Sequence, residues 1–364
     1  MAKAKNQDKL SEYRRKRSFN RTPEPSGSDG KHEPAGGGRF VVQQHDATNL
    51  HWDLRLEHEG VALSWALPRG IPQLPDRSAN RLAVRTEDHP LKYLEFHGEI
   101  PAGEYGAGTM TIWDSGTYEA EKLRNDEVIA TFSGERLKGR YVLFRTGGKN
   151  WMIHRMDPPL DPKRQPIPDD LSPMQHRRGE LPEEGEWGYE IAWGGLRTMV
   201  WCEPGHIRKS QSRGLDRETV EAFPEIRRIA RSLGSTEAVL DGELVVLDAD
   251  GAPDAARLRE RKAATSDSVA RRLARDKPAT LMLFDLLFCD GRLLTDLPYE
   301  ERRERLEGLA LNGQAWQTPS WHAGDGRPLL EAARARGLAG LMAKRLGSPY
   351  LPGKRSDDWV KVEA

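Results

Sequence analysis

A short polar segment near residue 50 carries side chains whose types and spacing suit metal-assisted phosphate chemistry. Within 50–56, His51, Asp53 and Arg55 alternate with apolar residues. Because successive side chains of a strand point to opposite faces, this alternation predicts a strand with one polar and one apolar face. His45 lies on the preceding turn, close enough to supply a second imidazole. Two imidazoles and one carboxylate suit a divalent metal with open coordination positions, and Arg55, which only donates, can bind a phosphate oxygen beside it.

A second segment repeats this pattern. Arg81, Arg85, Glu87 and His89 share one parity, and apolar residues take the other. Charge on one face of a barrel strand often means only solvent, but imidazole, carboxylate and guanidinium together favour a catalytic site. Iron oxygenases use the same ligand set. They also need room for an organic cosubstrate, and the arginines on these faces favour phosphate instead.

Composition excludes several classes of protein. The chain has 364 residues, with 56 Lys+Arg against 56 Asp+Glu and a mean hydropathy of -0.72. No run of about 18 apolar residues occurs and the first forty residues are polar, which argues against a transmembrane helix and a signal peptide and favours the cytoplasm. Cys202 and Cys289 both lie in apolar runs, which argues against a disulfide framework and a cysteine zinc site.

The first half of the chain contains two segments of different composition. Residues 1–38 contain the basic run 14–17 and end in three glycines. They predict a disordered basic tail that either faces solvent or contacts nucleic acid. Across 39–157, short period-two segments separated by Gly and Pro predict a small antiparallel β-barrel, with Trp52 and Trp65 in its core.

The second half begins after a proline-rich stretch. Six prolines fall between residues 156 and 173, so 158–173 predicts a semi-rigid linker. In 174–364, strand-like segments alternate with helix-like ones, which predicts an α+β domain. The expected strands are 187–191, 239–247 and 280–288, and the expected helices are 216–233, 299–306 and 327–336.

Residues 39–157 closely resemble the phosphoesterase domain of bacterial DNA ligase D, the end-healing module of nonhomologous end joining. The matching segments are 40–47, 50–57, 64–66, 81–84, 87–91 and 100–108. The resemblance implies a metal-dependent activity, with manganese preferred, that removes a 3′ phosphate or a terminal ribonucleoside from a primer strand. It implies metal ligands at His45, His51 and Asp53. It implies catalytic or phosphate-contacting groups at Arg55, Arg81, His89, Tyr93 and Glu87, and at Arg69, where the family commonly has lysine.

Residues 174–364 resemble the adenylation domain of ATP-dependent DNA ligases, which implies a nucleotidyltransferase fold. The matching segments are 189–197, 212–214, 223–225, 240–245, 284–287, 340–345 and 359–361. The nucleotide-binding residues implied by the resemblance are Arg197, Glu243, Phe284, Lys344 and Lys361.

This second resemblance breaks down at four polar positions. Ala192 stands where the family has its nucleophilic lysine, and Gly194 where it has an aspartate. Ala339 replaces an acidic residue, and Glu363 replaces a lysine. A methyl group cannot attack the α-phosphate of ATP. We therefore expect a degenerate domain kept for folding or binding, with ATP binding left open and no OB-fold domain after residue 364.

Together these features predict a bacterial 3′-phosphoesterase of double-strand break repair with an inactive ligase-like domain. The expected partners are DNA ends with a 3′ phosphate or ribonucleotide, with Ku and a separate ligase or polymerase as candidates, and no membrane. Two alternatives stay open: an active ATP-dependent DNA ligase, and a non-catalytic scaffold that holds DNA ends.

Overall fold

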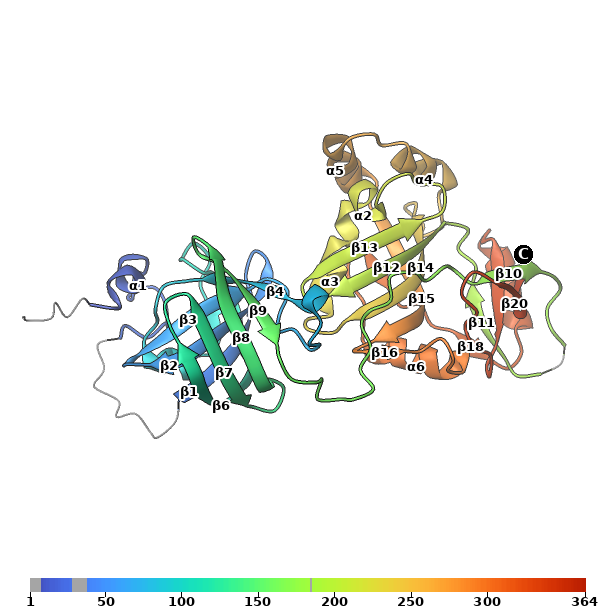
Figure 1. Cartoon of the computed structure of the whole chain (residues 1–364). Coiled ribbons are helices and arrows are strands. Elements are labelled where there is room, and N and C mark those ends of the chain that lie inside the picture. Colours follow the sequence, from blue (N-terminus) through green and yellow to red (C-terminus); the bar gives the residue numbers. More distant parts are fainter. Residues whose placement is uncertain (1–7, 28–37, 184) are drawn as a thin grey trace, which may run out of the picture. The chain divides into compact units, whose positions relative to one another are not determined.

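The computed structural model describes residues 8–27, 38–183 and 185–364 (Figure 1). The chain divides into two compact units, Met1–Pro162 and Lys163–Ala364. The boundary lies inside the proline-rich stretch, and residues after it pack in the second unit: Ile167 and Leu171 are buried against its core. These residues therefore belong to the second unit in the structure. In the described part of the chain, no helix combines the length and apolarity needed to cross a membrane.

The first unit is built almost entirely from strands. Its elements are α1 (Ser11–Arg15), β1 (Gly38–Asp46), β2 (Leu50–His58), β3 (Val61–Leu67), the 3-10 helix η1 (Arg77–Ala79), β4 (Arg81–Arg85), the 3-10 helix η2 (Leu91–Glu95), β5 (Gly98–Ile100), β6 (Gly108–Leu123), β7 (Glu127–Ser133), β8 (Lys138–Gly147) and β9 (Asn150–Arg155).

These strands close into an antiparallel barrel, as the sequence predicts. The order is β1-β2-β3-β4-β9-β8-β7-β6-β5, and β6 also pairs with β1, so eight strands form the ring and β5 extends β6 (Figure 1). The apolar face of β2 fills the barrel core, where Trp52 and Trp65 are each 1% exposed. Trp65 packs edge-on against Trp151. The prediction that both tryptophans are core residues is confirmed.

The opposite face of β1 and β2 is covered by a second layer rather than by solvent. Leu91 and Leu94 of η2 pack on Val41 and Ala62. Asp53 and Arg55 are consequently buried. The polar face that the sequence predicts is real, but it lies between two layers.

Part of that second layer comes from the segment predicted to be a disordered tail. Residues 8–27 include α1, and Tyr13 is fully buried in a cluster with Tyr93 and Ile100. For 8–27 the prediction of disorder is wrong, because composition says nothing of a complementary surface elsewhere that can bury an aromatic ring. Residues 1–7 and 28–37 of the predicted tail lie outside the described residues.

The second unit has mixed α/β architecture. Its elements are β10 (Gln175–Arg178), β11 (Trp187–Ile191), β12 (Leu196–Glu203), β13 (His206–Ser212), α2 (Thr219–Ala222), the 3-10 helix η3 (Pro224–Arg228), α3 (Ile229–Ser232), β14 (Ala238–Val246), α4 (Ala255–Lys262), α5 (Asp267–Asp276), β15 (Ala279–Cys289), β16 (Arg292–Leu293), α6 (Tyr299–Gly308), β17 (Trp316–Gln317), β18 (His322–Ala323), α7 (Arg327–Ala335), β19 (Gly340–Arg345) and β20 (Arg355–Glu363).

Two sheets organise this unit, with strand orders β10-β20-β19-β11-β18 and β13-β12-β14-β15-β16. The predicted strands and the helices at 299–306 and 327–336 are confirmed within a few residues. The helix expected at 216–233 is instead broken into α2, η3 and α3. Pro224 explains the break, because proline cannot donate the hydrogen bond that would continue the first helix.

Candidate metal centre and nucleotide-like pocket

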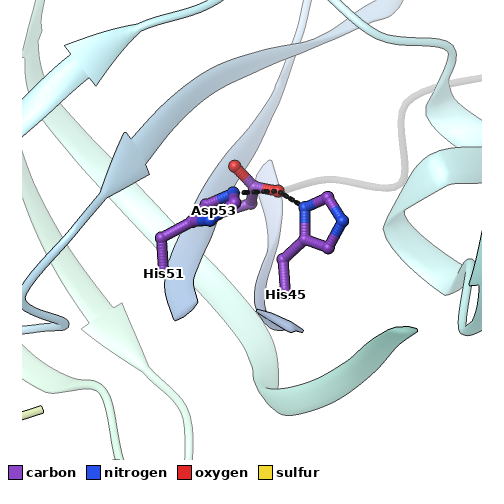
Figure 2. A group of neighbouring side chains, drawn as sticks. All are labelled: His45, His51 and Asp53. Atoms are coloured by element: carbon purple, nitrogen blue, oxygen red, sulfur yellow. Dashed lines mark ion pairs between the residues drawn. The ribbon is translucent and has the colours of Figure 1, made fainter. Parts of the chain in front are cut away.

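The hairpin of β1 and β2 brings the three predicted metal ligands together. His45 and His51 are direct cross-strand partners, and Asp53 lies two residues further along β2 on the same face. The Asp53 Oδ2 atom is 3.6 Å from His45 Nδ1 and 3.9 Å from His51 Nε2 (Figure 2). One ligand atom from each residue lies within 4.8 Å of the others. A single ion can therefore contact all three.

Backbone carbonyls fix which nitrogen of each imidazole faces the centre. His45 Nε2 is 2.9 Å from the carbonyl of Gly106, and His51 Nδ1 is 2.9 Å from the carbonyl of Asn49. A carbonyl only accepts, so these nitrogens carry the protons and the lone pairs of His45 Nδ1 and His51 Nε2 point toward Asp53. Three lone pairs that converge without a proton between them repel one another, and a cation relieves that repulsion. The residues present thus fit a divalent metal, with the carbonyls as the outer shell that orients its ligands.

Arg55 holds the aspartate of this cluster in place. Its Nη2 donates to Asp53 Oδ2 at 3.1 Å, its Nε to Gln43 at 2.7 Å, and its Nη1 to Ser64 at 2.8 Å. Burial would raise the pKa of Asp53, but the Arg55 charge opposes burial most strongly, and the pKa falls below its usual range. Each guanidinium nitrogen of Arg55 already has a partner within the protein. The structure therefore gives Arg55 a positioning contact that the sequence does not predict.

His89 and Tyr93 lie beside Arg55. The Arg55 guanidinium is 4.5 Å from the centre of the Tyr93 ring, which is 4.7 Å from the His89 ring. His89 Nδ1 is 2.8 Å from the carbonyl of Glu87, so this nitrogen is protonated and donates. Burial, and then the charges of Arg55 and Arg17, hold the pKa of His89 well below its usual value. His89 is consequently a neutral imidazole whose Nε2 accepts.

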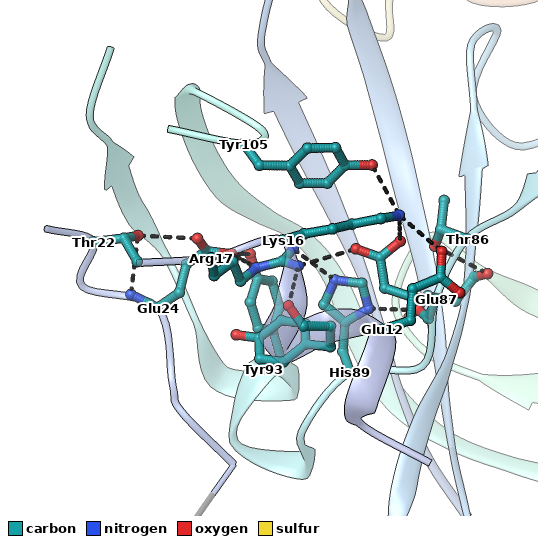
Figure 3. A network of polar contacts seen from close by, with 12 residues as sticks. Glu12, Lys16, Arg17, Thr22, Glu24, Thr86, Glu87, His89, Tyr93 and Tyr105 are labelled. Carbon is teal, nitrogen blue, oxygen red and sulfur yellow. Dashed lines mark hydrogen bonds and ion pairs between the residues drawn. The ribbon is translucent and has the colours of Figure 1, made fainter. Parts of the chain in front are cut away.

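The segment 8–27 adds functional groups that the sequence analysis missed. Arg17 lies with its Nη2 3.3 Å from His89 Nε2 and its Nη1 3.0 Å from Glu87 Oε1 (Figure 3). Glu24 accepts from Arg17 at 2.7 Å and from the Tyr93 hydroxyl at 2.7 Å. These contacts bring a guanidinium to the histidine from a different part of the chain. The only signal in the sequence was the pair of aromatic residues, at 13 and 19, flanking the basic run.

Arg69 and Arg81 are the remaining predicted residues of this unit. Arg69 is exposed in the turn after β3. Arg81 begins β4, half-buried and in register with Ile153 of β9. The shared parity expected for 81–89 fails because β4 ends at Arg85, and an irregular segment before η2 positions Glu87 and His89.

The second unit contains a small pocket between its sheets at the predicted nucleotide-binding residues. The cavity measures about 110 Å³, and its lining includes Arg197, Glu243, Phe284, Lys344 and Lys361. Arg197 donates to Asp241 at 2.6 Å and lies over the Phe284 ring. Lys344 is 1% exposed and pairs with Glu190 at 2.8 Å. Burial lowers the pKa of Lys344 and raises that of Glu243.

Three of the positions predicted to depart from the ligase pattern, Ala192, Gly194 and Ala339, line this pocket or the cavity next to it. Ala192 lines the pocket, with its amide bonded to the carbonyl of Gly340. A side chain at Gly194 would begin 3.3 Å from the Ala339 methyl group. Gly194 and Ala339 line an adjoining cavity of about 210 Å³ whose other walls include Trp193, Val245, Val246, Leu258 and Leu338.

Comparison with known families gives two matches. Residues 43–145 match the family described as DNA Ligase D 3'-phosphoesterase domain. Residues 175–363 match the family described as ATP dependent DNA ligase domain.

Curated relatives match along nearly the whole chain. The chain is 40% identical over 360 residues to the multifunctional non-homologous end joining protein LigD of Mycobacterium bovis, and 36% identical over 408 residues to its namesake from Pseudomonas aeruginosa. These matches cover 97% of this chain but 45% and 47% of the relatives, so the chain spans about half their length. A solved structure, mycobacterial DNA ligase D complexed with ATP and MES, is similar over 53% of this chain and 60% of its own, at 34% identity and a TM-score of 0.46.

Proposed function

Because the chain belongs to the DNA ligase D family, with a 3′-phosphoesterase domain followed by an ATP-dependent DNA ligase domain, we propose that its first unit heals DNA 3′ ends in nonhomologous end joining. The reaction is hydrolysis of a 3′ phosphate, or removal of a terminal ribonucleoside, from a primer strand. The observation that carries this proposal is the convergence of His45, His51 and Asp53 on one point beside a cluster of guanidinium groups.

The cluster supplies the metal site of the proposed reaction. A divalent ion bound there, for which we propose Mn²⁺, would act as a Lewis acid on a phosphate oxygen. A water oxygen forms a bond to phosphorus, the bond from phosphorus to the 3′ oxygen breaks, and that oxygen takes up a proton. Arg55 keeps Asp53 ionised and in place throughout, and Arg17 brings a second positive charge to the phosphate as negative charge develops.

His89 is the proposed proton carrier. In the arrangement seen here its Nε2 accepts from Arg17. To protonate the leaving oxygen, His89 must first take up a proton at Nε2, and the negative charge of an arriving phosphate favours that step. Tyr93 packs against the His89 ring, and its hydroxyl is fixed by a hydrogen bond to Glu24. Arg81 and Arg69 remain proposed phosphate contacts that depend on the substrate reaching them.

The test is release of phosphate from a primer that ends in a 3′ phosphate, in the presence of Mn²⁺. We expect conversion to a 3′ hydroxyl, and we expect His51→Ala to lower the rate by more than about 100-fold because a metal ligand is lost. His58→Ala is the matched control: His58 ends the same strand but lies outside the cluster. An active His51→Ala variant, or a wild type that leaves the 3′ phosphate in place, would refute the proposal.

For the second unit, we propose that it does not form a covalent AMP adduct. Ala192 offers no nucleophile, and the pocket of about 110 Å³ is smaller than the roughly 300–1,000 Å³ typical of small-molecule sites. Incubation with labelled ATP and Mg²⁺ or Mn²⁺, followed by denaturing electrophoresis, should show no labelled band. A labelled band would instead support the active ligase. We propose Ku and a separate ligase or polymerase as partners. They would act with this protein on the healed ends in the bacterial cytoplasm.

A further inference from the structure

Tyr105 differs from the other aromatic side chains close to the metal cluster. It is 50% exposed, whereas Tyr13 and Tyr93 are 0% and 1% exposed, and Trp52 and Trp65 belong to the barrel core. A large aromatic side chain left half in solvent loses apolar burial that the barrel gives to its other rings. Its position therefore calls for another partner.

The loop that carries Tyr105 is attached directly to a metal ligand. Residues 101–107 join β5 to β6, and the carbonyl of Gly106 accepts from His45 at 2.9 Å. Consecutive Cα atoms are about 3.8 Å apart, so the Tyr105 backbone lies within one residue of this anchor. Gly106 has a φ of 79°, a left-handed conformation that favours glycine and turns the chain there. On the other side, Glu104 pairs with Arg21 at 3.0 Å. The loop is thus held at both ends while the ring between them stays open.

Positive charge from residues 8–27 lies close to this ring. The Lys16 ammonium is 3.5 Å from the Tyr105 hydroxyl and 4.9 Å from the ring centre, and the Arg17 guanidinium is 5.4 Å from that centre (Figure 3). Lys16 also pairs with Glu87 at 2.9 Å and keeps 21% of its side chain exposed. An exposed ring beside a partly exposed lysine is a combination that binds single-stranded nucleic acid, because a base stacks on the ring and a phosphate pairs with the ammonium.

We propose that Tyr105 is the stacking platform for the nucleobase of the 3′-terminal nucleotide, and that Lys16 pairs with the phosphate on the 5′ side of that nucleotide. This inference rests on the proposed phosphoesterase function and adds the subsite that holds the base while the 3′ phosphate reaches the metal. Since every base has a flat face, the subsite accepts all four bases and recognises a nucleotide rather than a sequence.

The experiment compares two 3′-phosphorylated primers that differ only at the last nucleotide. One carries a normal base, and the other carries a stable abasic sugar. We expect wild type to show a KM about tenfold higher on the abasic primer, with kcat nearly unchanged, because one stacking contact is lost. Tyr105→Ala should raise the KM for the normal primer by a similar factor and add no further loss on the abasic primer. Tyr105→Phe, which keeps the ring, should resemble wild type.

Each outcome separates this inference from the function on which it rests. An active wild type with equal KM values for both primers would overturn the base subsite and leave the phosphoesterase standing. A Tyr105→Ala variant that still loses about tenfold on the abasic primer would also overturn the subsite, since the base would then bind elsewhere. If the alanine variant does not fold, Tyr105→Leu fills the loop and takes its place. A wild type that releases phosphate from neither primer would overturn both proposals.

Discussion

The guanidinium of Arg17 lies 3.3 Å from the one nitrogen of His89 that can accept a proton. Seventy-two positions of sequence separate the two residues. Tyr13, buried against the rings of His89 and Tyr93, brings them together. The segment 8–27 therefore contributes side chains to the candidate site on the barrel.

Removal of the Arg17 charge should slow the reaction without emptying the metal site. We expect Arg17→Ala to lower the rate of phosphate release by about 10²-fold, the usual cost of losing a donor that stabilises transition-state charge. Arg14→Ala is the matched control, because Arg14 is 41% exposed and pairs with Asp8. Calorimetric titration with Mn²⁺ should give equal affinities for both variants and wild type. Weakened metal binding in Arg17→Ala alone would contradict the role in charge stabilisation.

Gln43 contacts the candidate metal site indirectly, through Arg55. Its side-chain oxygen accepts from Arg55, and its nitrogen donates to the carbonyls of Tyr93 and Phe96. Gln43→Leu removes all three bonds, so Arg55 and through it Asp53 should be less well fixed. We expect Mn²⁺ affinity to fall by about 10-fold, measured by calorimetric titration. Gln44→Leu is the matched control, because Gln44 lies one residue along on the other face of β1, and it should leave the Mn²⁺ affinity unchanged. An equal loss of Mn²⁺ affinity in Gln44→Leu would contradict the proposed role of Gln43.

The convergence of the three candidate metal ligands could be predicted because their geometry follows from local rules. His45, His51 and Asp53 lie on one hairpin, where the alternation of side chains and cross-strand pairing fix which groups meet. The partners of Arg55 could not be predicted in the same way. Gln43 and Ser64 are ordinary polar residues on neighbouring strands, and only the register of three strands shows that they face the guanidinium.

The contribution of 8–27 escaped prediction for a different reason. A prediction from composition weighs the apolar surface that a segment can bury against the entropic cost of ordering its backbone. By that criterion, residues 8–27 contain too few apolar residues to fold. Its order depends instead on a docking surface formed by other parts of the chain. The contacts of Tyr13 and the buried pairs of Arg17 with Glu24 and Glu87 supply what local apolar residues do not.

The low pKa of His89 predicts how stability depends on pH. A histidine in the unfolded chain titrates near 6.5, whereas burial and the charges of Arg55 and Arg17 hold the folded pKa well below that. Between the two values the unfolded chain binds a proton that the folded chain does not. The free energy of unfolding should therefore fall as the pH drops from about 7.5 to about 5.

His89→Gln isolates this effect from the other histidines. Urea unfolding of metal-free wild type and variant should show a steeper loss of stability in wild type over that pH range. The difference between the two curves is the contribution of His89. Parallel curves, or a wild type that gains stability as the pH falls, would contradict the neutral, accepting imidazole.

The pocket of the second unit should not form a lysine-AMP adduct when a lysine is introduced at position 192. In Ala192→Lys the new amine still lacks the two acidic groups that the ligase pattern places beside the lysine, because Gly194 and Ala339 occupy those positions. Gly194 also has a φ of 69°, so an aspartate introduced there would be strained, and its first side-chain atom would lie 3.3 Å from Ala339.

We expect neither Ala192→Lys nor its combination with Gly194→Asp to yield labelled lysine-AMP after incubation with labelled ATP. Ala192→Met is the matched control, because methionine is about as long as lysine but carries no charge. Similar thermal unfolding midpoints for the two variants would show that a long side chain is accommodated equally well in both. A covalent adduct in Ala192→Lys alone would mean that the phosphate-binding part of the pocket is intact and that only the nucleophile is missing.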